Sequence, residues 1–156
     1  SKLHFVCLWI TSTTSSLNWL LSYINFILIM SILDFVMVGS NDYKKSSEFY
    51  DAVLAPLKLK KTVITEKYIG YSHSSDPDKT LFYVTNPVNG EPATFGNGTQ
   101  ITLLADSKEA VEKFYEIAMS KGATDEGGPG VRSDGNYYAY IRDFDGNKIA
   151  AKSNLK

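Results

Sequence analysis

The chain has 156 residues, close to the commonest size of a single domain, and an apolar content of 44% that allows a substantial core. Its formal net charge of −1 argues against a general nucleic-acid binder, which would carry a basic stripe. Its single cysteine, Cys7, can form no internal disulfide and has no thiol partner for a metal site.

Residues 1–29 differ in composition from the rest of the chain. No Asp, Glu, Lys or Arg occurs from Leu3 through Leu33. About twenty mostly apolar residues can span a membrane, so a signal anchor is one interpretation. Against it, Lys2 is the only flanking cation and the apolar run continues without a break into a predicted strand. We therefore expect an apolar extension outside the functional domain, with Met30 as the natural start and no membrane association.

The next part of the chain alternates between strand and helix patterns. Residues Ile32–Val38 are β-branched and apolar and precede turn residues that also cap helices, so they predict a strand. Apolar residues at helical spacing predict a helix from about Tyr43 to Leu54, and Pro56 ends it. A glycine-marked linker covers residues 89–98. Three further strands are predicted at 60–67, 68–73 and 80–85.

The second half has the stronger helix signals. Asp106 is predicted to cap a helix, with Glu109 three residues later as in a capping box, and Gly122 closes the helix as a left-handed cap. Residues Asp125–Gly135 are predicted to form a glycine-rich loop. The arms of a hairpin are predicted at 137–143 and 148–152. Each half therefore predicts a βαβββ module, in which the second strand of the second half has the weakest pattern.

A shift of 65 residues brings the second half onto the first. The aromatic pair Phe114–Tyr115 then falls on Phe49–Tyr50, within the same frame of apolar strand, polar cap and helix. Two copies are too few for a solenoid, so a duplicated module is predicted. We expect one α+β domain over residues 30–156, with modules at about 31–96 and 97–154.

Three segments carry a family resemblance: the helix end Glu48–Asp51, the linker Gly90–Gly98 and the terminal hairpin Arg142–Ile149. With these segments in this order, Met30–Asn154 resembles the vicinal oxygen chelate superfamily of glyoxalases, bleomycin-resistance proteins and extradiol dioxygenases. The linker and hairpin are most similar to its glyoxalase-like branch. The resemblance implies two βαβββ modules whose curled mixed sheets form a cup. In the enzymes of this family, a divalent metal in the cup is chelated by vicinal oxygens of the substrate.

The resemblance also places the four metal-ligand positions of the family on this sequence. The family ligands, usually His, a carboxylate, His and Glu, come from the first and last strands of each module. The corresponding positions hold Phe35, Thr85, Gln100 and Ala150. Phenyl and methyl groups offer no lone pair, and an amide oxygen or a hydroxyl is a weak ligand for such metals. We therefore expect a degenerate site and no metal cofactor.

Strand alternation predicts which side chains line the cup. If Val36 and Val38 face their helix, the neighbouring positions of the first strands and of the last strand face the cup. The hairpin tyrosines are added to this set, although the pattern does not determine their facing. Such a surface suits a ligand with an apolar body and a few polar or anionic groups. The predicted lining residues are Phe35, Met37, Gln100, Thr102, Tyr138, Tyr140, Lys148 and Ala150.

Few side chains are candidates for catalysis, and the catalytic residues stay unassigned. His4 lies in the extension, and His73 stands beside serines near a strand end, which does not make a catalytic pair. The segment Gly127–Arg132 could hold an anion through backbone amides and its arginine. It lacks the Gly-Lys-Ser/Thr ending of a phosphate loop, so we interpret it mainly as a rim.

The sequence therefore favours a metal-free, cytoplasmic small-molecule binding protein, monomeric or homodimeric, with no nucleic-acid partner. Two alternatives stay open. One is a glyoxalase-like lyase or isomerase with a relocated or vestigial metal site. The other is a structural or regulatory module whose cup is filled by its own side chains, Phe35 and Met37 first. A pocket of several hundred cubic ångströms favours the ligand-binding and enzymatic alternatives, and a filled cup favours the structural one.

Overall fold

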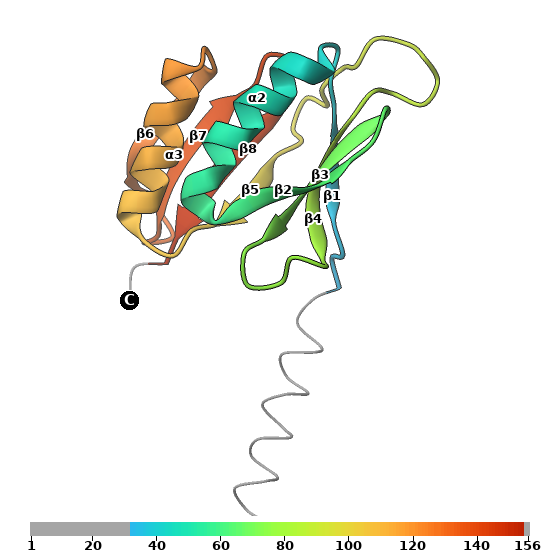
Figure 1. Ribbon diagram of the computed structural model, residues 1–156. Helices are drawn as coiled ribbons and strands as arrows, with labels where there is room; N and C mark the ends of the chain where they lie inside the picture. Colours follow the sequence, from blue (N-terminus) through green and yellow to red (C-terminus); the bar gives the residue numbers. More distant parts are fainter. Residues whose placement is uncertain (1–31, 155–156) are drawn as a thin grey trace, which may run out of the picture. The chain divides into compact units, whose positions relative to one another are not determined.

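The structure is a computed structural model that describes residues 32–154 (Figure 1). Each half of this region forms one four-stranded mixed sheet with one long helix, in the order strand, helix, three strands. The predicted α+β fold of two βαβββ modules is confirmed. The prediction of an extension at 1–29 lies outside the described residues. Within residues 32–154, no helix is long and apolar enough to cross a membrane.

The first module has the strand order β1-β4-β3-β2. Its first and last strands, β1 and β4, are parallel, and the other two strand pairs are antiparallel. The helix supplies the crossover that a parallel pair requires. The elements are β1 (Val36–Gly39), α2 (Tyr43–Leu54), the 3-10 helix η1 (Ala55–Leu57), β2 (Leu59–Ile64), β3 (Tyr68–His73) and β4 (Thr80–Thr85).

The second module repeats this topology with the order β5-β8-β7-β6, in which β5 and β8 are parallel. Figure 1 shows its helix α3 beside α2, and both helices lie on one side of the sheets. The elements are β5 (Ile101–Leu104), α3 (Lys108–Ser120), β6 (Thr124–Val131), β7 (Tyr137–Arg142) and β8 (Lys148–Ser153).

The prediction of a loop over Asp125–Gly135 is wrong for most of that segment, because β6 extends to Val131. The strand pairs with β7 despite its glycines, and its register shifts between Asp125 and Gly130. Gly127 has a φ of +145°. Such a backbone is typical of bulges, so the glycines permit an irregular strand that side-chain propensity does not predict.

The N-cap residues of the two helices lie 65 positions apart, and the second of them is not the residue predicted from the sequence. Asp42 caps α2 by accepting from the backbone N–H of Lys45, and Ser107 caps α3 by accepting from that of Ala110. The predicted cap Asp106 instead forms an ion pair with Lys58, with 2.5 Å between Oδ2 and Nζ. Two adjacent polar residues both suit a cap, and the extended backbone of Ser107 decides between them.

The hydrophobic core lies between the helices and the sheets. Phe49 and Phe114, one from each module, are both fully buried in it. Tyr50 is fully buried as well, whereas its counterpart Tyr115 packs only partly against the core. The repeated aromatic pairs therefore occupy corresponding places on α2 and α3, and the second member of each pair differs in burial.

The turn between β7 and β8 joins the two modules. Tyr50 donates its hydroxyl to Asp143 Oδ2 at 2.5 Å in a buried contact. The Asn147 side chain donates to the carbonyl of Gly39, and the backbone and side chain of Asn41 donate to Asp145. Burial raises the pKa of the Asp143 carboxyl. These contacts hold the first strand of one module against the last hairpin of the other.

Candidate ligand-binding cup

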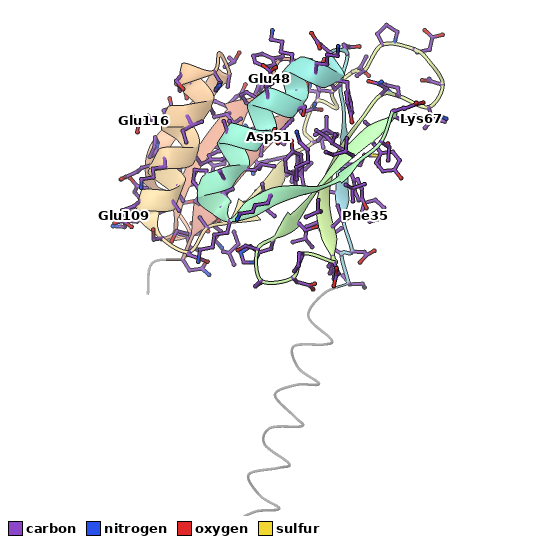
Figure 2. The ribbon with its side chains drawn as sticks, viewed as in Figure 1. Phe35, Glu48, Asp51, Lys67, Glu109 and Glu116 are labelled. Carbon is purple, nitrogen blue, oxygen red and sulfur yellow. The ribbon has the colours of Figure 1, made fainter. Side chains whose placement is uncertain are left out.

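The candidate site is the face of the two sheets turned away from α2 and α3, which we call the cup. Along β1 and the residue before it, Val38 is 5% exposed and belongs to the core, while Phe35 and Met37 are 47% and 49% exposed. Figure 2 shows Phe35 well away from the helices that carry Glu48 and Glu116. Side chains on β1 therefore alternate as strand geometry requires.

The first sheet contributes an aromatic face to the cup, formed by Phe35, Met37, Tyr68 and Tyr83. The Tyr83 ring makes edge contacts with Phe35 at 5.1 Å and with Tyr68 at 5.7 Å between ring centroids. A Cβ atom at Gly70 would lie 2.9 Å from the Tyr83 ring, so this glycine leaves room for it. Sequence reasoning missed both tyrosines, although Tyr83 alternates with the core residues on either side of it.

The second sheet contributes a cationic face, formed by Arg132, Tyr138, Tyr140, Lys148 and Lys152. The rings of Tyr138 and Tyr140 are stacked, with centroids 5.7 Å apart and 5° between their planes. Tyr137, the first residue of β7, instead donates its hydroxyl to Glu112 on α3. The sequence pattern does not determine which side of the sheet these tyrosines face. In the structure, Tyr138 and Tyr140 lie on the cup side of β7.

Three other predicted residues lie next to this face. Ala150 on β8 is fully buried and is paired with Thr102 on β5 and with Tyr140 on β7. The Gln100 side chain donates to the Thr102 hydroxyl at 3.0 Å. The floor of the cup at this point is thus a methyl group bordered by a neutral hydrogen-bonding pair and an aromatic ring.

Two carboxylates accompany the cationic face. Glu126 binds Arg142 Nε at 2.7 Å and Lys148 Nζ at 3.1 Å, and these contacts lower its pKa. Hydrogen bonds from Asn136 and Tyr138 lower the pKa of Asp134 to about 2. The bond to Asp134 raises the pKa of Tyr138 to about 12. The phenol is therefore protonated at neutral pH and is not available as a general base.

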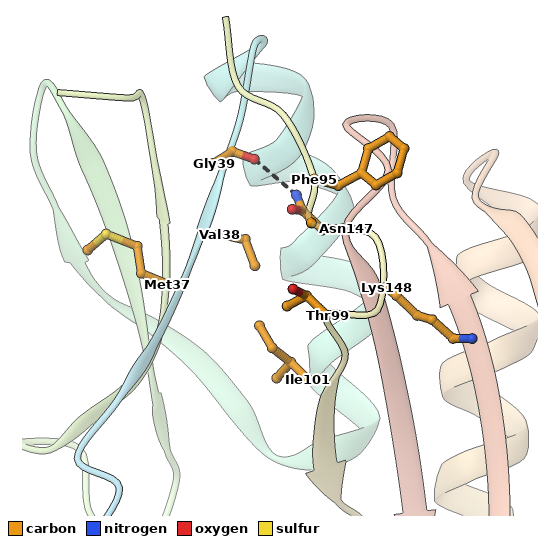
Figure 3. A pocket seen from close by; sticks show the side chains of 9 residues that line it. Met37, Val38, Gly39, Phe95, Thr99, Ile101, Asn147 and Lys148 are labelled. Carbon is orange, nitrogen blue, oxygen red and sulfur yellow. Dashed lines mark hydrogen bonds between the residues drawn. The ribbon is translucent and has the colours of Figure 1, made fainter. Parts of the chain in front are cut away.

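A small cavity lies between β1 and β5. Its volume is about 90 Å³, well below the several hundred cubic ångströms of an enclosed small-molecule site. Figure 3 shows Val38 and Ile101 reaching toward this space while the long side chains of Met37 and Lys148 diverge from it. The lining residues are Met37, Val38, Gly39, Phe95, Gly96, Thr99, Ile101, Asn147 and Lys148.

The cavity has two consequences for the cup. It is too small to enclose a ligand of ordinary size, so a ligand in the cup has to lie on an open sheet face. Phe35 and Met37 are each about half exposed, so these side chains do not fill the cup as the structural alternative expects.

The strand register corrects one of the four predicted metal-ligand positions. Met37 on β1 is paired with Tyr83 on β4, and its counterpart Thr102 on β5 is paired with Ala150 on β8. Tyr83 therefore corresponds to Ala150, and Thr85 does not. Met37 and Tyr83 are 46 positions apart and Thr102 and Ala150 are 48 apart, so the shift of 65 becomes 67 at the last strands.

The side chains at these positions do not fit a divalent metal. Phenyl, phenol, amide and methyl groups replace the imidazoles and carboxylates that such an ion requires. Within residues 32–154, no group of three or more His, Cys, Asp or Glu side chains is arranged to hold a metal. His73, the last residue of β3, contacts Ser75, with 2.6 Å between Nδ1 and Oγ.

Comparison with known proteins identifies the family of the chain. The model of the Glyoxalase/Bleomycin resistance protein/Dioxygenase superfamily matches residues 32–151. The chain belongs to this superfamily. No protein of curated function matches the sequence.

Solved structures of this superfamily resemble the chain. A glyoxalase/bleomycin resistance protein from Albidiferax ferrireducens T118 is 40% identical, with a TM-score of 0.73 over 80% of this chain and 100% of its own. A lactoylglutathione lyase from Agrobacterium tumefaciens is 17% identical, with a TM-score of 0.57 over 80% and 94%. A fosfomycin resistance protein from Listeria monocytogenes is 14% identical, with a TM-score of 0.58 over 81% and 95%. At these identities the last two share the fold alone.

Proposed function

We propose that the chain is a small-molecule binding protein that works without a metal. The observation that carries the proposal is the exposed chemistry on the sheet faces turned away from the helices: Phe35 and Met37 are half exposed on the first, and the second stacks two tyrosines beside cations. Covering apolar surface with a ligand lowers the free energy of the complex, and a few charged groups at the border of that surface orient the ligand.

The chemistry of the degenerate site separates this proposal from a glyoxalase-like isomerase. Such an enzyme needs an ion to polarise the substrate oxygens and to stabilise the charge that develops, a contribution of several kcal/mol. Phe35 and Gln100 cannot hold that ion, and Ala150 offers no carboxylate as a base. We therefore expect no isomerisation of the hemithioacetal of methylglyoxal and glutathione.

A metal titration tests the first half of the proposal. Calorimetry of the full chain with Zn²⁺ or Ni²⁺ is expected to show no stoichiometric binding at the cup. The variant that combines Phe35→His, Gln100→His and Ala150→Glu is expected to gain binding. A control with Glu48→His and Glu116→His adds two histidines on the helices and is expected not to. Binding of one ion per chain together with turnover in the unaltered protein would contradict the proposal.

A neutral probe tests the second half. N-phenyl-1-naphthylamine fluoresces when it enters an apolar site and carries no charge at neutral pH. We expect the full chain to bind it and Met37→Gln to weaken that binding about threefold to fivefold, because contact area on the aromatic face is lost. Val88→Gln is the matched control, since Val88 is 101% exposed in the turn after β4. No binding of this probe, or equal weakening by both variants, would rule out the cup as an apolar site.

A further inference from the structure

Positive charge gathers on the cup side of β7 and β8. In their antiparallel register, Tyr138 lies opposite Lys152 and Arg142 lies opposite Lys148. All four side chains stand on the same side of the sheet as Ala150, because alternate residues of a strand share a face. Each tyrosine of the stacked pair therefore has a cation beside it.

The stacked rings hold these cations close to the sheet. Lys152 Nζ lies 5.6 Å from the centroid of the Tyr138 ring, and Lys148 Nζ lies 5.4 Å from that of Tyr140. The guanidinium of Arg132 lies 5.2 Å from the Tyr140 ring. Cations within about 6 Å of a ring centroid are attracted to its face. The rings thus fix where the charges stand.

The glycines of β6 make the position of Arg132 possible. A Cβ atom at Gly130 would lie 2.8 Å from Arg132 Nη1, and one at Gly127 would lie 3.1 Å from the Tyr140 ring. Arg132 Nη2 also donates to the carbonyl of Gly128 at 2.7 Å. The irregular, glycine-rich strand therefore leaves room for the guanidinium beside the stacked tyrosines.

The charges on this surface do not balance. Glu126 is shared between Arg142 and Lys148, and Asp134 accepts from Tyr138, so two carboxylates accompany the four cations Arg132, Arg142, Lys148 and Lys152. Among residues 32–154, Lys152 and Arg132 form no ion pair. The surface is thus positive in a chain whose formal net charge is −1.

We propose that the ligand of the cup is a small amphiphilic anion, with an apolar or aromatic body and one carboxylate- or sulfonate-like group. The body lies on the stacked rings of Tyr138 and Tyr140, and the anionic group lies between Lys148 and Lys152. This inference rests on the proposed small-molecule function and adds the chemical class of the ligand. Opposite charges a few ångströms apart near a protein surface attract each other strongly enough to set a preference for anions.

Two probes that differ only in charge test the inference on the full chain. 8-Anilinonaphthalene-1-sulfonate has the ring system of N-phenyl-1-naphthylamine and adds one sulfonate. We expect the anionic probe to bind at least about fivefold more tightly, which corresponds to one modest charge interaction. Its affinity should fall as salt is added, and that of the neutral probe should not.

Variants separate the cup from other positive surfaces. Lys152→Gln is expected to weaken the anionic probe about fivefold and to leave the neutral probe unchanged. Lys60→Gln, on the exposed side of β2, is the matched control and is expected to change neither affinity. Equal affinities for the two probes in the unaltered protein, or equal effects of the two variants, would overturn the anion preference while the small-molecule function stands. Failure of both probes to bind would overturn the proposed function as well.

Discussion

The two modules share a frame on their helix sides and differ on their cup sides. On the helix side, the caps Asp42 and Ser107 and the core residues Phe49 and Phe114 recur at one spacing. On the cup side, the first module is aromatic and apolar and the second is cationic. Packing against a helix restricts which side chains a strand position can hold, whereas a position on an open face accepts many different side chains. The duplication therefore determines the architecture and leaves the ligand preference to the differences between the copies.

The connection between the modules is also asymmetric. Tyr50 is fully buried and donates to the buried Asp143 of the other module. Tyr115, at the corresponding position of α3, lies only partly in the core and near Gly128. The first module thus supplies a buried hydrogen bond across the module boundary, and within residues 32–154 Tyr115 makes no equivalent bond.

The largest effect is expected at the shared core positions. Phe49→Ala and Phe114→Ala should each lower the free energy of unfolding by about 3–5 kcal/mol, because each removes a fully buried ring and leaves a cavity. Urea unfolding followed by circular dichroism measures both. A loss below about 1 kcal/mol at one position alone would show that the helices do not play equivalent parts.

The tyrosines should separate the modules where the phenylalanines do not. Tyr50→Phe removes the donor to the buried Asp143 carboxylate and should cost about 2 kcal/mol, the usual range for a hydrogen bond to a charged group. Tyr115→Phe should cost less than about 0.5 kcal/mol, as expected away from buried networks. The same urea titration measures both, and equal costs would remove the asymmetry.

The N-caps should again behave alike. Asp42→Ala and Ser107→Ala should each lower stability by about 1 kcal/mol, because each leaves a backbone N–H at a helix start without its acceptor. Asp106→Ala is the control, since its ion pair with Lys58 is exposed and should leave the melting temperature nearly unchanged. A larger loss of stability at Asp106 than at Ser107 would indicate that Asp106 caps α3, as the sequence pattern predicts.

The buried carboxyl of the module boundary should give a small pH dependence. Burial raises the pKa of Asp143 in the folded protein, so the folded state holds its proton more tightly than the unfolded state. Its contribution to stability should therefore decline as pH rises from about 4, the unfolded value, through the folded pKa. Asp143→Asn should remove this decline, and Asp78→Asn, in an exposed turn, should not. An unchanged profile in Asp143→Asn would show that the carboxyl is not shifted.

Elements set by local patterns could be predicted from the sequence, and those set by register could not. The apolar stripe of each helix and the repeat of Phe49 and Phe114 were sufficient for the fold. The choice of Thr85 failed because the second module is two residues longer between its paired strands, a difference that only the ladder reveals. The facing of Tyr138 and Tyr140 follows from the buried Ala139 and Ile141 beside them, a signal that was present in the sequence.

The position of a bound neutral probe tests the central claim most directly. The described chain offers two methionine methyl groups as reporters: Met37 on the cup side of β1 and Met119 on α3, packed against the core. The full chain also contains Met30, so the signals of its methionine-methyl NMR spectrum are assigned with Met37→Leu and Met119→Leu. We predict that N-phenyl-1-naphthylamine shifts the Met37 signal and leaves the Met119 signal unchanged. A shift of Met119 with Met37 unmoved would contradict a ligand site in the cup.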